Sequence, residues 1–185
     1  GFTALAFNIR QAAAIAERDG VDAVRDLFAR SGVKPGCWSV PVDWRNDEQT
    51  LRVDLKQLPA FAGLGRDLGC PRALSGVMPG SDDRPFAENM AFHEERLRPV
   101  AEVLAGAGCR LGLEFIGPKT LRDRFRHEFL YTLDGVMTLG QAIGTGNVGV
   151  LLDIWHLYTS GGEIEDVKTL RPEQIVAVHV NDAPA

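Results

Sequence analysis

The sequence predicts an α/β fold, a (β/α)8 TIM barrel that is present in part. Strand-like and helical segments alternate along the chain at a repeat of roughly 30 to 40 residues, which is typical of parallel βαβ units. Three strands end in residues of metal-ligand type, whereas a doubly wound sheet concentrates its site at one switch point. No strand is followed by the G-x-G-x-x-G dinucleotide fingerprint. These observations favour the barrel over the doubly wound sheet.

The first half of the chain is expected to alternate strands with long helices. Its elements are a strand at Gly1–Asn8, a helix at Ile9–Ser31, a strand at Gly36–Val42, a helix at Thr50–Leu68 and a strand at Ala73–Met78. Gly20 is a point at which the first helix can split, because glycine disfavours a helix interior. Pro59 predicts a kink or break in the second helix, because proline lacks the N–H that the helix needs.

The second half continues the alternation. Its elements are a helix at Pro85–Ala107, a strand at Arg110–Gly117, a loop with a helical turn at Lys119–Leu133, a helix at Gly135–Ile143, a strand at Val148–Asp153, a short helix at Glu163–Leu170 and a strand at Ile175–Asp182. The loop at Lys119–Leu133 is expected to lie over the strand mouths. His93 lies mid-helix among charged residues, and we expect it on the solvated surface.

Composition limits the class of protein. The chain is 45% hydrophobic, which is enough for a core, and its net charge of −5 gives no attraction to nucleic acid or to an anionic membrane. No apolar run is long enough to span a bilayer. Three cysteines without a C-x-x-C spacing favour a reducing compartment, so we expect a cytoplasmic protein.

Three strands each deliver one metal-ligand type of side chain, namely Glu114, Asp153 and His179. Alternation along the last strand puts His179 and Asn181 on one face, and Val176, Val178 and Val180 on the other. The small or polar face is expected to line the barrel interior, so all three ligand-type side chains point into the barrel mouth.

Two carboxylates and one imidazole suit Mn²⁺, Mg²⁺, Co²⁺ or Zn²⁺. A metal at such a site polarises a carbonyl and stabilises an enediolate, while a nearby carboxylate moves a proton between adjacent carbons. Simpler interpretations stay open. Glu114 alone is compatible with a structural carboxylate, and His156 with packing or capping beside Trp155 and Tyr158. The basic residues from Lys119 onwards suit an anionic substrate or a solvated face.

Three segments in order, L-G-L-E-F-I-G-P, V-G-V-L-L-D-I-W-H and V-H-V-N-D, resemble the sugar phosphate isomerase/epimerase family of xylose isomerase-like TIM barrels, and most nearly the inosose isomerases of myo-inositol catabolism. The resemblance implies that Glu114, Asp153 and His179 bind a divalent metal. It also implies that His156 hydrogen-bonds a substrate oxygen and that Glu114 doubles as an acid/base. With Asn181 and Lys119, His156 forms the expected set of substrate contacts.

The same resemblance predicts the extent of the domain. Gly1–Asn8 matches the second strand of the family, and the family's further glutamate, on the eighth strand, would lie beyond Ala185. We therefore expect residues 1–185 to form a single barrel domain truncated at both ends, comprising about strands 2 to 7.

The leading hypothesis is a metal-dependent isomerase or epimerase of a small sugar or polyol ketone, such as an inosose or ketose. A dehydratase acting on an inosose or a dehydroshikimate-type acid remains an alternative, because both reactions begin with metal-assisted proton abstraction. A non-catalytic metabolite-binding barrel is a third. Four histidines and the negative charge disfavour the apurinic endonuclease relatives. The expected partner is a small molecule, with no nucleic acid and no membrane, and homo-oligomerisation is left open.

Overall fold

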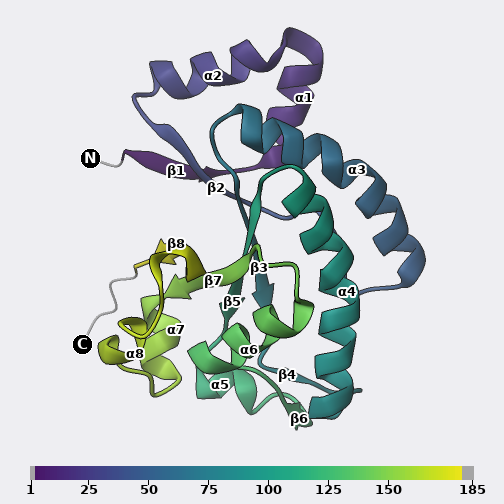
Figure 1. Cartoon of the computed structure of the whole chain (residues 1–185), viewed down its shortest axis with the longest axis vertical. Coiled ribbons are helices and arrows are strands. Elements are labelled where there is room, and N and C mark those ends of the chain that lie inside the picture. Colours follow the sequence, from purple (N-terminus) through teal and green to yellow (C-terminus); the bar gives the residue numbers. More distant parts are fainter. Residues whose placement is uncertain (1–2, 181–185) are drawn as a thin grey trace.

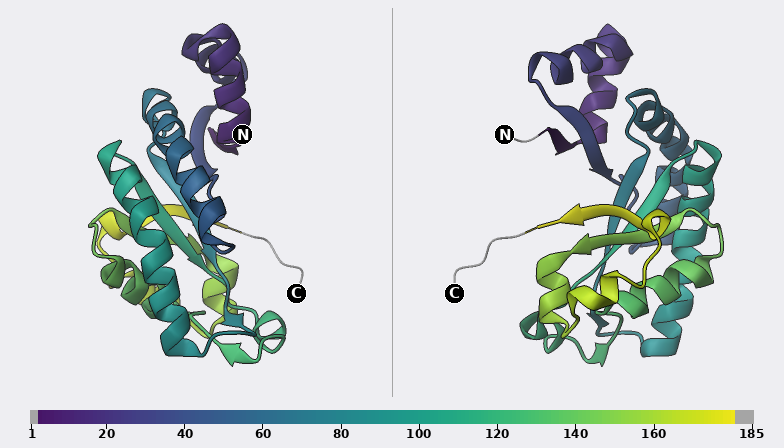
Figure 2. Two further views of the ribbon diagram at one scale, coloured as in Figure 1. Left: turned by 90° about the vertical axis from the view of Figure 1, so that its right-hand side faces the viewer. Right: turned by 60° about the vertical axis from the view of Figure 1, so that its left-hand side comes forward.

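A curled sheet of six parallel strands forms the centre of the molecule in the computed structural model, which describes residues 3–180 (Figures 1 and 2). Its spatial order is β1-β2-β3-β5-β7-β8. The strands are β1 (Ala4–Phe7), β2 (Lys34–Ser39), β3 (Arg72–Val77), β5 (Arg110–Phe115), β7 (Val148–Asp153) and β8 (Ile175–His179). Neighbouring strands in sequence are neighbours in the sheet, as in a TIM barrel, and the predicted fold class is confirmed.

Helices cover the convex face of this sheet (Figure 2). The contacts run from α1 to α3, from α3 to α4 and from α4 to α6, while α2 packs on α1. The helices are α1 (Ile9–Asp19), α2 (Val21–Arg30), α3 (Glu48–Asp67), α4 (Phe86–Gly106), α5 (Lys119–Arg122), α6 (Leu133–Ile143), α7 (Ile154–Thr159), α8 (Ile164–Val167) and the 3-10 helix η1 (Pro172–Gln174). Two short strands, β4 (Gly80–Ser81) and β6 (His127–Glu128), pair antiparallel beyond the main sheet. None of the helices within residues 3–180 combines the length and the apolar character that crossing a membrane requires.

Side-chain caps and glycines set the ends of the helices. Asn8 accepts the backbone N–H groups of Arg10 and Gln11 and so starts α1. Asp47 does the same for α3 through the N–H of Thr50. Gly20 has a φ of +87°, a conformation that glycine adopts readily, and it separates α1 from α2 as expected.

Of the kink or break expected at Pro59, the structure excludes the break. α3 runs without interruption from Glu48 to Asp67 with Pro59 inside it. Pro59 lies on the exposed side of the helix. The carbonyl that loses its helical partner there can be solvated, so continuing the helix costs less than it would on a buried face.

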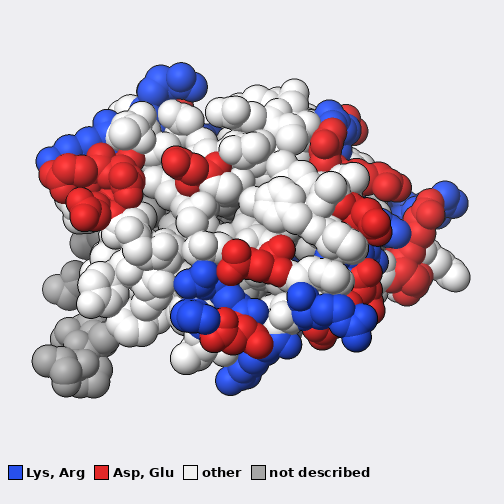
Figure 3. Space-filling model, turned by 90° about the horizontal axis from the view of Figure 1, so that it is seen from below, with Lys and Arg blue, Asp and Glu red and all other residues white. Residues whose placement is uncertain are grey.

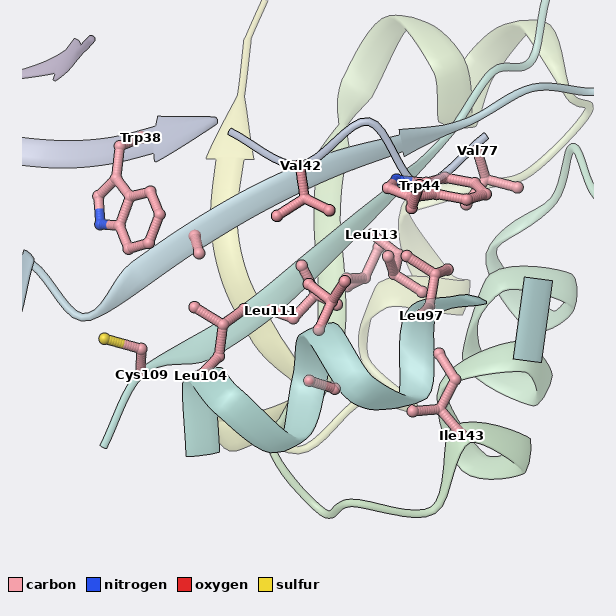
Figure 4. Close-up of a cluster of buried hydrophobic side chains, with 14 of the residues drawn as sticks. Trp38, Val42, Trp44, Val77, Leu97, Leu104, Cys109, Leu111, Leu113 and Ile143 are labelled. Atoms are coloured by element: carbon pink, nitrogen blue, oxygen red, sulfur yellow. The ribbon is translucent and has the colours of Figure 1, made fainter. Parts of the chain in front are cut away.

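Two apolar clusters lie on opposite sides of the sheet. The large one fills the space between the sheet and the helices, and Figure 4 shows part of it, including Trp44, Leu111 and Leu113. The small one lies on the concave side and consists of Cys37, Leu74, Leu151 and Val176. Gly112 faces this second cluster, and an added Cβ there would lie 2.8 Å from Leu74 Cδ2. A larger residue than glycine at this position would therefore clash with the cluster.

Val176 lies on the concave side, although strict alternation placed it with the opposite face. The pairing of β7 with β8 shifts between Val150 and Leu151, where Val150 pairs with Ile175 and Leu151 pairs with Ala177. One residue of β8 is therefore extra, as in a β-bulge, and the alternation changes there. His179 nevertheless pairs with Asp153 at the end of the strand.

His93 is buried, not solvated, with 5% of its surface exposed. Its Nδ1 lies 2.8 Å from the carbonyl oxygen of Asn89, and its ring lies against the rings of Trp44 and Phe129. Burial lowers its pKa to about 4. Position decides this outcome, because His93 precedes the buried Leu97 by one helical turn on the inner side of α4.

Candidate metal centre

The candidate metal centre lies at the carboxyl ends of three adjacent strands. Glu114 is the penultimate residue of β5, Asp153 is the last residue of β7 and His179 is the last residue of β8. Parallel strands bring their carboxyl ends to the same edge of the sheet, which is where barrels of this class hold their sites.

The structure brings these three side chains together. His179 Nδ1 lies 3.5 Å from Glu114 Oε1 and 3.9 Å from Asp153 Oδ2. Glu114, Asp153 and His156 each offer a ligand atom, and these atoms lie within 4.8 Å of one another. The cluster thus comprises two carboxylates and two imidazoles, with His156 adjoining the predicted set.

Asp153 divides its two carboxylate oxygens between two tasks. Oδ1 accepts the N–H groups of Trp155, at 2.8 Å, and His156, at 3.1 Å, and so caps α7. Oδ2 faces His179. The residue is 6% exposed, so the carboxylate is held from two sides in a largely dry place. No helix was expected at α7, because its six residues have no apolar periodicity and the cap starts it.

Close backbone packing positions His156. The N–H of Gly117 donates to His156 Nδ1 at 3.4 Å. A Cβ at Gly117 would lie 2.1 Å from the carbonyl oxygen of His156, so only glycine allows this approach of the loop after β5 to α7. The D-x-x-H spacing therefore has a local structural basis, with the aspartate capping the helix that carries the histidine.

The electrostatics of the cluster favour a bound cation. Burial raises the pKa of Glu114; His156 and His179 counteract the rise, and Asp153 adds to it. Two carboxylates in one desolvated place repel each other unless a positive charge lies between them. Oxygen and nitrogen ligands in this number suit a divalent ion such as Zn²⁺ or Mn²⁺, and the residues present therefore fit one.

A pocket of about 250 Å³ opens beside the cluster. Glu114 and His179 line it together with Trp44, Arg45 and Ser75. Sequence reasoning missed these last three. Trp44 and Arg45 lie in the connection between β2 and α3, and their contribution depends on how that connection folds back. Ser75 lies on β3.

Two expected substrate contacts are not placed in this pocket. Lys119 Nζ lies 2.5 Å and 2.7 Å from the carboxylate oxygens of Asp123, and its side chain is 71% exposed. Asn181 lies outside the described residues. On the face seen from below in Figure 3, acidic and basic residues are intermixed and form no large area of one sign.

Known proteins with a similar sequence or structure identify the family of this chain. An inosose isomerase of Halalkalibacterium halodurans is 21% identical over 164 residues, which cover 88% of this chain and 55% of that protein. The chain therefore spans about half the length of this curated relative. The solved structure of a xylose isomerase domain protein from Alicyclobacillus acidocaldarius subsp. acidocaldarius is 34% identical, with a TM-score of 0.91 over 100% of this chain and 66% of that one.

A second solved structure, the IOLI protein with a binding zinc atom, is 17% identical, with a TM-score of 0.73 over 98% of this chain and 64% of that one. At this identity the likeness shows the fold alone. A family model for the xylose isomerase-like TIM barrel matches residues 1–185. With the parallel strand order and the cluster at the strand ends, this match shows that the chain belongs to the xylose isomerase-like TIM barrel family.

Proposed function

We propose that this protein is a divalent-metal-dependent isomerase or epimerase of a small sugar or polyol ketone. The observation that carries the proposal is the convergence of Glu114, Asp153, His156 and His179 at the carboxyl ends of the strands. The inosose isomerase relative supports the reaction class, and the zinc atom in a neighbour of the same fold supports a divalent metal.

Glu114, Asp153 and His179 would hold the metal. When bound, a divalent ion supplies electrophilic polarisation of a substrate carbonyl. Glu114 lies between the cluster and the pocket, with its side chain 21% exposed, so it can reach both the ion and a substrate carbon. We assign to it the transfer of a proton between adjacent carbons, by way of an enediolate.

His156 has a different role in this proposal. Its Nδ1 accepts the N–H of Gly117, so the neutral ring carries its proton on Nε2. A ring with Nε2–H donates a hydrogen bond and does not ligate through that atom. We therefore assign His156 to a substrate oxygen and not to the metal.

Metal content tests the proposal directly. Protein dialysed against Zn²⁺, Mn²⁺ or Co²⁺ should retain about one ion per chain, and Glu114→Gln and His179→Gln should each lose it. His127→Gln is the matched control, because His127 lies on β6 outside the cluster. The metal-loaded protein is then screened for turnover of ketoses and inososes. Full metal content in both cluster variants, or none in the unaltered protein, would refute the site.

A further inference from the structure

Part of the wall of the pocket beside the candidate metal centre comes from the connection between β2 and α3. Trp44 and Arg45, in that connection, line the same pocket as Glu114 and His179. At about 250 Å³ the pocket is smaller than the roughly 300 to 1,000 Å³ of most ligand pockets, so it suits a molecule of monosaccharide size. One small substrate in this pocket could therefore contact both Arg45 and the candidate metal centre.

Trp44 is a fixed platform in this wall. Its ring is fully buried among the side chains of the main core (Figure 4). Its Nε1 donates to Ser75 Oγ at 3.0 Å, and its ring meets the edge of His93 at a centroid distance of 5.0 Å. A side chain that stacks on Trp44 is therefore held in position relative to the pocket.

Arg45 stacks on that platform. Its guanidinium carbon lies 4.0 Å from the centre of the Trp44 ring. One of its terminal nitrogens donates to the carbonyl oxygen of Gly76, and Gly76 is the partner of Glu114 in the pairing of β3 with β5. A Cβ at Gly76 would meet nothing within 4 Å, so there is open space at this position of β3.

The charge of Arg45 has no close carboxylate partner. Within residues 3–180, no acidic oxygen lies within 4.0 Å of its guanidinium nitrogens. Desolvation lowers the pKa of Arg45, and Asp43 offsets this only in part. Although the residue as a whole is exposed, its charged end is partly desolvated and is not neutralised by a salt bridge.

We propose that Arg45 selects a substrate that carries an anionic group, a carboxylate or a phosphate, and this inference rests on the proposed function. A guanidinium presents paired N–H donors that match two oxygens of such a group. Stacking on Trp44 and the bond to Gly76 fix the fork before the ligand arrives, which reduces the entropy lost on binding. The substrate class is therefore a small sugar acid or sugar phosphate rather than a neutral sugar.

Calorimetric titration with D-glucuronate, D-glucose 6-phosphate and D-glucose tests the assignment. The protein should bind one of the two anions at least about tenfold more tightly than D-glucose, because a charge-assisted bidentate contact is worth that much. The two anions separate carboxylate from phosphate recognition. Arg45→Gln should abolish the preference, and Arg45→Lys, which keeps the charge but loses the fork, should restore part of it.

Arg84→Gln is the matched control. Arg84 also stacks on an aromatic ring, that of Phe92, at 3.8 Å. It lines a neighbouring pocket that includes Arg45 but not Glu114, and it does not line the pocket beside the candidate metal centre. This variant should keep the preference for the anion. Equal binding of all three sugars by the unaltered protein, or an unchanged preference in Arg45→Gln, would overturn the inference.

Zinc content measured on the same samples separates this inference from the proposed function. If the protein binds no metal but Arg45→Gln still loses the anion preference, the function fails and the role of Arg45 stands. If metal binds but the preference is missing, the role of Arg45 fails alone. Melting temperatures of both Arg45 variants establish that the comparison is made on folded protein.

Discussion

At the scale of single residues, Asp153 combines the capping of α7 with the proposed role of metal ligand in one carboxylate. The oxygen that caps α7 fixes the direction in which the other oxygen faces His179. The two tasks respond differently to substitution. Asparagine caps a helix as well as aspartate does, but its amide oxygen lacks the charge that makes a strong metal ligand.

Asp153→Asn should therefore lose metal affinity and turnover while the melting temperature changes little. Asp153→Ala should lose the cap as well, at a cost of about 1 kcal/mol in the free energy of unfolding. Metal analysis and calorimetry on the two variants separate the effects. Normal turnover with full metal occupancy in Asp153→Asn would remove this residue from the metal centre.

His93 gives a pH-dependent prediction. Its pKa of about 4 in the folded protein lies below the 6.5 of an unperturbed histidine, so at pH values between these two the unfolded chain binds the proton more tightly. The stability that follows is fully present above pH 6.5 and is lost as the pH falls through about 4. Between neutral pH and about pH 4.5, the unaltered protein should lose roughly 2 to 3 kcal/mol more than His93→Gln, in which other titrating groups are the same. Urea unfolding at both pH values measures the difference, and parallel losses would show that His93 is accessible to protons.

At the scale of elements, the contact of Gly117 with α7 determines where His156 lies. Gly117→Ala places a methyl group against the carbonyl oxygen of His156, so α7 or the loop must move. We expect a loss of about 1 to 3 kcal/mol in stability and a weaker metal centre. Gly63→Ala, in open space within α3, is the control and should gain about 0.5 to 1 kcal/mol. Unfolding curves and metal titrations check both, and an unchanged metal affinity in Gly117→Ala would show that α7 moves independently of the centre.

The sequence predicted the elements whose signals are local and repeated. The strand that carries Glu114 and the split at Gly20 are examples, because hydrophobic runs and glycine act on neighbouring residues. A break at Pro59 and the face expected for Val176 were wrong for the opposite reason. The exposure of Pro59 depends on which side of α3 packs, and the position of Val176 depends on a shift between two strands.

The candidate site likewise contains residues that the sequence predicts and residues that depend on tertiary contacts. Glu114, Asp153 and His179 stand out because strand ends of a parallel fold meet wherever the helices pack. Trp44 and Arg45 could not be predicted, since their place in the pocket depends on a hydrogen bond to Ser75 and a stacking contact, which are tertiary. The spacing of four residues between His93 and Leu97 indicates that both lie on the buried side of the helix. The charged residues next to His93 in the sequence instead favoured a solvated position.

At the scale of the whole molecule, the six-stranded sheet has two edges. Within residues 3–180, β1 and β8 each pair with one strand only. Edge strands expose backbone N–H and C=O groups that pair readily with another chain. Val178, on β8, is also 51% exposed. We therefore predict that a polypeptide of residues 1–185, produced on its own, self-associates as its concentration rises.

Light scattering after size-exclusion chromatography measures this association. Val178→Lys should lower it, because a charge on an edge strand opposes strand pairing. Val53→Lys is the matched control, since Val53 is a valine of similar exposure, 48%, on the helix α3. Equal effects of the two substitutions would show that surface hydrophobicity in general drives the association. An unaltered polypeptide that stays monomeric at all concentrations would refute the prediction.

The position of the candidate metal centre at strand ends also has a kinetic consequence. Glu114, Asp153 and His179 meet only after complete helical crossovers have closed, and contacts between distant parts of a chain form late in folding. Interactions that are absent from the transition state slow unfolding and leave the folding rate unchanged. A divalent ion should therefore lengthen the lifetime of the native protein without accelerating refolding, as followed by tryptophan fluorescence after rapid mixing. Faster refolding with the ion would instead place the ends of β5, β7 and β8 in the folding nucleus.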